Sequence, residues 1–169
     1  MGLAEIRRRC AGQIEALDLP DPVSVETICE LVAALRGRPI HILRHELPSD
    51  SPCGLRIATS NADYLVVKNS AVPAHQDLIL LHELGHVLFD PDVGPTLDED
   101  LVKALVPQVD PATVTSMLGR GRYALESEQA AEVFATLLLG RTSRWTPGTP
   151  RIVAPGADDI VGRIERALE

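Results

Sequence analysis

The residues best suited to chemistry in this chain are two histidines and a glutamate in the segment His82-Glu83-Leu84-Gly85-His86. On a helix, residues four apart lie on one face, so both imidazoles of this H-E-x-x-H pattern can reach one metal ion. Glu83 adjoins His82, so its carboxylate lies beside the metal, where a base can take a proton from metal-bound water. Neutral imidazoles suit zinc, which keeps a position open for water in catalytic sites. We therefore predict a Zn²⁺ site with His82 and His86 as ligands and Glu83 as the general base.

The alternative is that both histidines are ordinary hydrogen-bonded helix residues without a metal. The residues around them weigh against it, because 78–81 and 87–89 are entirely apolar and predict a mostly buried helix. Two histidines and a glutamate are costly to bury without a partner. A bound metal ion would satisfy all three side chains.

A zinc site of this type needs a third protein ligand, and a later acidic segment offers one. On a helix, Glu128, Ala131, Glu132 and Ala135 share one face, and the two alanines allow close approach to the motif helix. Glu128 can then bind the metal, and Glu132, one turn later, can hold a ligand histidine through its other ring nitrogen. Glu126 is the rival ligand but points to a different side of the helix. The competing interpretation of each glutamate is a solvated surface charge.

The elements that must position these residues are mainly helical. Hydrophobic periodicity and capping residues predict helices at 3–17, between Ser24 and Gly37, and at 75–89, 96–105, 110–119 and 124–139. Extended segments at 39–47, 54–59 and 64–68 predict strands, and turn residues 60–63 join the last two as a hairpin. We therefore expect an α+β fold in which a small three-stranded antiparallel sheet packs on a helical body. The strand at 64–68 is expected at the sheet edge, where it could pair with an extended substrate.

Length and composition limit the domain organisation and the partners. The 169 residues suit one domain at 1–141, with its core at about 20–140, followed by a loop and a C-terminal helix at 142–169. A net charge of -8 and 3% aromatic residues argue against direct nucleic-acid binding. Three scattered cysteines suggest no disulfide framework, and no segment suggests a signal peptide or a membrane span. We expect a cytoplasmic protein with no membrane partner.

The chain resembles the ImmA/IrrE-type zinc metallopeptidases over roughly residues 20–140. Three pieces occur in order: the strand Tyr-Leu-Val-Val-Lys-Asn, the HELGH helix, and a helix reading E-x-x-A-x-x-F-A-x-x-L-L from Glu128. The resemblance implies a zincin-like fold with zinc ligands His82, His86 and Glu128 and with Glu83 as general base. Members of the family include proteases that cleave helix-turn-helix repressors. The implied activity is therefore zinc-dependent hydrolysis of a peptide bond in a regulatory protein, with a transcriptional repressor as partner.

The chain departs from the usual family pattern at three places. Glu132 stands where the family usually has Asn or Asp, and Gly140 where it usually has Pro. The stretch between His86 and Glu128 is longer than usual, and we expect it to carry extra helices at 97–119 that cover the cleft or contact a partner.

Two other functions remain open from the sequence. The chain could be a non-catalytic zinc-binding regulatory partner of a repressor or antitoxin, or a purely structural helical domain without a metal. The intact Glu83 argues against a catalytically dead site.

Overall fold

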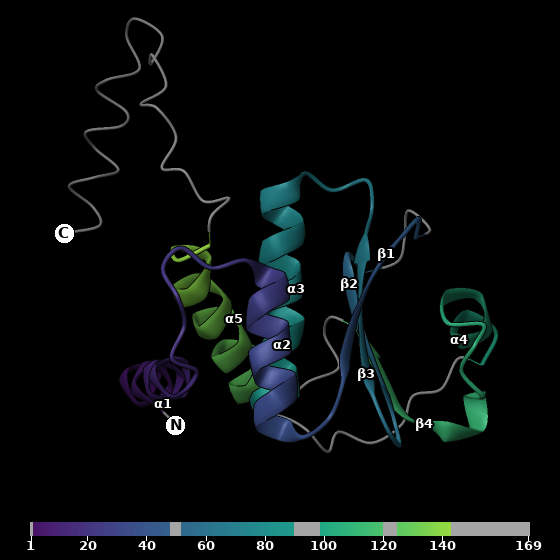
Figure 1. Cartoon of the computed structure of the whole chain (residues 1–169), viewed down its shortest axis with the longest axis horizontal. Coiled ribbons are helices and arrows are strands. Elements are labelled where there is room, and N and C mark those ends of the chain that lie inside the picture. Colours follow the sequence, from purple (N-terminus) through teal and green to yellow (C-terminus); the bar gives the residue numbers. More distant parts are fainter. Residues whose placement is uncertain (1, 48–51, 90–98, 120–124, 143–169) are drawn as a thin grey trace, which may run out of the picture.

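The computed structural model describes residues 2–47, 52–89, 99–119 and 125–142, which form an α+β fold (Figure 1). In chain order the elements are α1 (Leu3–Ala16), α2 (Val25–Arg36), β1 (Ile40–His45), β2 (Gly54–Thr59), β3 (Asp63–Lys68), α3 (Pro73–Phe89), α4 (Glu99–Leu105), a 3₁₀ turn (Pro111–Thr113), β4 (Val114–Gly119) and α5 (Leu125–Leu139). The predicted α+β class is confirmed. The predicted loop and C-terminal helix at 142–156 and 161–168 lie outside the described residues, apart from position 142 itself.

The ends of α2 show how local chemistry sets helix boundaries. The Ser24 hydroxyl accepts a hydrogen bond from the Thr27 backbone N–H at 3.1 Å, as an N-cap does. Gly37 ends the helix in the left-handed region at φ 64°, which only glycine adopts without steric cost. Both boundaries were predicted from the sequence.

The sheet differs from the prediction in strand number and direction. It has four strands in the order β1-β3-β2-β4, and β1 runs parallel to β3 with Ile40 opposite Asp63. The hairpin of β2 and β3 is antiparallel, as predicted, and β4 pairs antiparallel with β2. The expected edge strand at 64–68 is therefore wrong: β3 lies between β1 and β2, and the edges are β1 and β4. Parallel pairing of β1 was not predictable because the alternation of side chains along a strand shows which face is buried and not which direction the strand runs.

The predicted helix at 110–119 is wrong, because this segment forms a 3₁₀ turn followed by β4. Asp110 does cap a turn, since its carboxylate accepts the Ala112 backbone N–H at 3.0 Å, but the turn ends after three residues. The chain then extends as β4 and supplies backbone partners along β2. Pairing with this strand outweighs the local helix-start signal. Of the extra helices expected at 97–119, only α4 is present.

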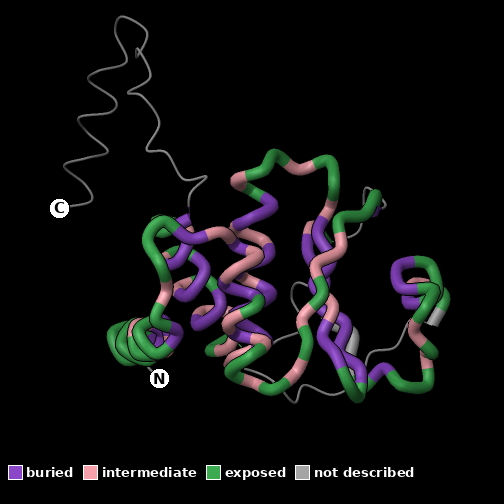
Figure 2. The backbone as a smooth tube through the Cα atoms, in the orientation of Figure 1, coloured by how far each residue is buried: buried purple, intermediate pink, exposed green. Residues whose placement is uncertain are grey.

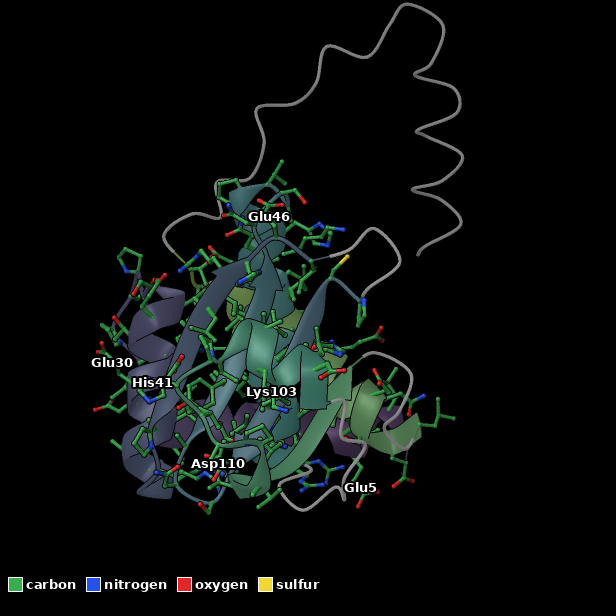
Figure 3. The ribbon with its side chains drawn as sticks, turned by 90° about the vertical axis from the view of Figure 1, so that its right-hand side faces the viewer. Glu5, Glu30, His41, Glu46, Lys103 and Asp110 are labelled. Carbon is green, nitrogen blue, oxygen red and sulfur yellow. The ribbon has the colours of Figure 1, made fainter. Side chains whose placement is uncertain are left out.

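Two hydrophobic clusters lie on opposite faces of the sheet. One joins the sheet to α1, α2, α3 and α5, and the other joins it to α4 and the chain after it. In Figure 2 the buried positions, drawn in purple, fall on the helices and strands between which these clusters lie. Figure 3 looks onto the second face, where Lys103 of α4 and Asp110 lie in front of the strands. Within the described residues, no helix combines the length and apolar character needed to cross a bilayer.

Candidate metal centre

Helix α3 carries the H-E-x-x-H motif through the interior of the protein. Leu80, Leu81 and Leu84 are fully buried on it, and so is His86, while Glu83 is 3% exposed. The prediction of a mostly buried motif helix is confirmed. Because burial of unpartnered polar side chains is costly, these residues need a compensating interaction.

Helix α5 lies against α3 because both helices carry small residues where they meet. A Cβ added at Gly85 would be 2.8 Å from Ala131 Cα and 3.0 Å from its Cβ, so only glycine fits at this approach. The predicted close approach through alanine is therefore confirmed at Ala131. It brings the first turn of α5, with Glu128, to the two histidines of α3.

Three donor atoms converge between these helices. His82 Nε2 and His86 Nε2 are 3.1 Å apart, and Glu128 Oε2 is 3.4 Å from the first and 3.9 Å from the second. One ligand atom from each residue lies within 4.8 Å of the others, so this group could hold a metal ion. Tetrahedral ligands about 2.0–2.1 Å from zinc are about 3.3 Å apart, close to these spacings.

The hydrogen bonding of Glu128 also fits a metal ligand. Its Oε1 is buried and has no hydrogen-bond partner among the described residues, although the side chain as a whole is 23% exposed. A cation bound through Oε2 at the centre of the three donors would neutralise the carboxylate and so offset the cost of burying Oε1. Glu126, the rival carboxylate, is exposed and lies outside the group.

The surroundings of His86 keep its imidazole neutral. Burial, followed by the neighbouring His82 and the Arg56 guanidinium, lowers the pKa of His86 from 6.5 to about 3. Neutral imidazole is the form that binds a metal. The site is thus electrostatically suited to a ligand role for His86 near neutral pH.

Ser127 is a site residue that the sequence analysis missed. Its hydroxyl lies 3.3 Å from His86 Nδ1, on the ring side away from the other donors. A proton on Nδ1 donated to this hydroxyl leaves Nε2 free for the metal. The only sequence signal was its position next to Glu128, and serine at such a position has many other uses.

Glu132 does not occupy the position predicted for it. Its side chain is exposed and forms no hydrogen bond or ion pair with any described residue. It lines a cavity of about 230 Å³ beside the metal centre, together with His82 and Glu83. Ser127, rather than Glu132, contacts a ligand histidine.

A buried ion pair connects the hairpin to the motif helix and was also missed. Arg56 of β2 donates from Nε and Nη2 to one carboxylate oxygen of Asp63 at 3.1 and 2.9 Å. Its Nη1 lies 3.5 Å from the His86 backbone carbonyl. Arg36 and Arg38 contact the other oxygen of Asp63 at 2.9 and 3.2 Å. This cluster links β2, β3 and α2 to the helix that carries the ligands.

The position of Glu83 completes the arrangement. Its carboxylate packs against the start of β2, where a Cβ at Gly54 would be only 2.8 Å from Glu83 Oε1. A glycine at this point leaves room for the acid between the sheet and the cavity. Two imidazoles and one carboxylate that could hold a metal ion, with a second carboxylate next to His82, form a set of groups suited to metal-assisted hydrolysis. Comparisons with protein-family models, with curated proteins and with solved structures found no match to this chain.

Proposed function

We propose that this protein is a zinc-dependent peptidase of the ImmA/IrrE type that hydrolyses a peptide bond in a regulatory protein, a helix-turn-helix repressor. The observation that carries the proposal is the convergence of His82, His86 and Glu128, with Glu83 beside them at a cavity. A cytoplasmic location and a repressor substrate come from the sequence and stay predictions.

The residues of the site divide the work of hydrolysis among them. His82, His86 and Glu128 would hold the ion, which when bound supplies Lewis-acid polarisation of the scissile carbonyl and a lowered pKa of water. Glu83 would accept a proton from the attacking water as the new C–O bond forms. It would then deliver that proton to the nitrogen of the amide as the C–N bond breaks, so that one acid and one amine leave.

The position of Glu83 favours catalysis over a purely regulatory zinc site. A structural zinc site is closed by four protein ligands, whereas the described residues offer three here. The carboxylate of Glu83 borders a cavity that a substrate could enter. Neither feature is needed by a protein that acts only by binding a repressor.

The decisive experiment compares the wild type with Glu83→Gln. Both proteins should contain about one zinc ion per chain by elemental analysis, since Glu83 is not a ligand. If the neighbouring gene encodes a helix-turn-helix repressor, that repressor is the substrate to test. It is incubated with each zinc-loaded protein and examined by mass spectrometry. Cleavage by the wild type alone supports the proposal.

One control and two further outcomes make the result interpretable. His86→Ala should lose most of its zinc, and full zinc occupancy in this variant would refute the ligand assignment. Equal cleavage by the wild type and Glu83→Gln would remove Glu83 from the mechanism. Zinc binding without any cleavage would favour the regulatory alternative.

A further inference from the structure

The cavity beside the metal centre has the size of one side chain. It lies between α3, α5 and the start of β2, and its volume is about 230 Å³. Sites for small-molecule ligands are usually larger, about 300–1,000 Å³. Because His82 and Glu83 both line it, a group inside this cavity would lie directly beside the reacting bond.

Two sides of the cavity carry aliphatic residues. Leu78 and Ile79 of α3 form one side, and Ala135 of α5 forms the other. A substrate side chain whose methylene groups are buried against these residues binds more favourably, by about 25 cal/mol per Å² of apolar surface buried. The cavity therefore favours a side chain with an extended apolar stem.

One charged group on the wall has no evident task in holding the metal. Glu132 is exposed, lines the cavity, and forms no ion pair or hydrogen bond with any described residue. The other carboxylate on the wall is Glu83, and no lysine or arginine is among the described residues that line the cavity. A cationic group entering it would gain a partner at Glu132, whereas an anionic one would be repelled.

We infer that Glu132 makes this cavity a specificity pocket for one basic side chain of the substrate, lysine or arginine, next to the scissile bond. These are the side chains that combine an apolar stem with a cationic head, so that the stem lies on Leu78, Ile79 and Ala135. The head then reaches the Glu132 carboxylate at the exposed end. The inference rests on the proposed peptidase function and names the class of substrate for that site.

The first test uses hydroxamates, which bind zinc directly and carry one side chain beside it. The probes are the Nα-acetyl hydroxamates of lysine, norleucine and glutamate, titrated into the zinc-loaded full chain by calorimetry at low salt. Norleucine keeps a comparable stem without the cation. We expect affinity in the order lysine, norleucine, glutamate, with lysine about tenfold tighter than glutamate, because an exposed pair contributes at most about 1 kcal/mol of attraction or repulsion.

Substitutions of Glu132 test whether its carboxylate causes this preference among the three probes. Glu132→Gln should make the lysine and norleucine probes bind equally, and Glu132→Lys should reverse the order so that glutamate binds more tightly than lysine. Glu126→Lys is the matched control, because it makes the same charge change at an exposed position of α5 that does not line the cavity. The control should keep the wild-type order.

The second test measures specificity in catalysis and separates the inference from the proposed function. A mixed peptide library cleaved by the wild type should show lysine or arginine enriched at one position beside the cleaved bond, and Glu132→Lys should remove this enrichment. Selective binding of the lysine probe without any hydrolysis would refute the peptidase but keep the pocket. If neither peptide hydrolysis nor probe affinity changed with the charge at position 132, the specificity pocket would be refuted and the peptidase function would stand. Absence of zinc-dependent hydroxamate binding would overturn both.

Discussion

Replacing Gly85 by alanine tests whether the close approach of α3 and α5 builds the metal centre. A methyl group there would be 2.8 Å from Ala131 Cα, whereas ordinary contacts start near 3.4 Å. The obstacle is backbone rather than a flexible side chain, so α5 would have to retreat by roughly half an ångström. That movement carries Glu128 away from the two histidines.

The expected energies follow from two opposing effects. Alanine in place of glycine inside a helix contributes about 1 kcal/mol of stability, while overpacking a tight contact costs about 1–3 kcal/mol. We expect the metal-free Gly85→Ala protein to be destabilised by about 0–2 kcal/mol. Zinc affinity should fall further, by about tenfold or more, because functional groups must be held to within about 0.5 Å.

Two measurements and one control decide the outcome. Urea unfolding of the chelator-treated protein gives the free energy of unfolding, and competition with a chromophoric chelator gives the zinc affinity. Gly12→Ala in α1 is the matched control, because a Cβ there meets nothing within 4 Å. It should gain up to about 1 kcal/mol and bind zinc normally. If Gly85→Ala gave the same result as Gly12→Ala, the reasoning about the helix contact would be refuted.

Three further predictions concern the surroundings of the ligands. Ser127→Ala should weaken zinc binding by about tenfold to a hundredfold in chelator competition, because His86 loses the hydroxyl that orients its ring, and unchanged affinity would exclude that role. The metal-free protein should lose about 2 kcal/mol of stability through His86 between about pH 7 and pH 5, since the unfolded imidazole takes up a proton below 6.5 and the folded one only near 3. Urea unfolding across this range should show a smaller loss for His86→Asn. Asp63→Asn should lower the free energy of unfolding by about 3–5 kcal/mol, because it leaves the buried Arg56 without its carboxylate. Arg44→Gln, at an exposed ion pair, should lower it by less than about 1 kcal/mol. Equal losses in the two variants would contradict the importance of burial.

The placement of His82 and His86 on one buried helix could be predicted from the sequence because it depends on local geometry. The i, i+4 spacing of His82 and His86 and the apolar residues around them are properties of one helix, whatever it packs against. The same holds for the cap at Ser24 and the left-handed Gly37, each set by a few neighbouring residues. Glu128 could be predicted as a member of the group because it shares one helical face with small residues.

The direction of β1 and the pairing of β4 could not be predicted, because they depend on residues far apart in the chain. The run from Asp110 carries a real capping signal, yet the available edge of β2 draws the following residues into β4. The pattern of β1 is equally compatible with parallel and antiparallel pairing, since alternation gives the buried face and not the direction.

Within the site, the sequence determined which residue types were available, and the tertiary structure decided which of them meet. Helical spacing placed Glu132 on the same face as Glu128 and suggested contact with a histidine. The depth of the contact at Gly85 instead brings Ser127 to His86 Nδ1 and leaves Glu132 at the cavity. An offset of one residue along a helix turns a side chain by about 100°, and only the packing of α5 on α3 selects between neighbouring positions.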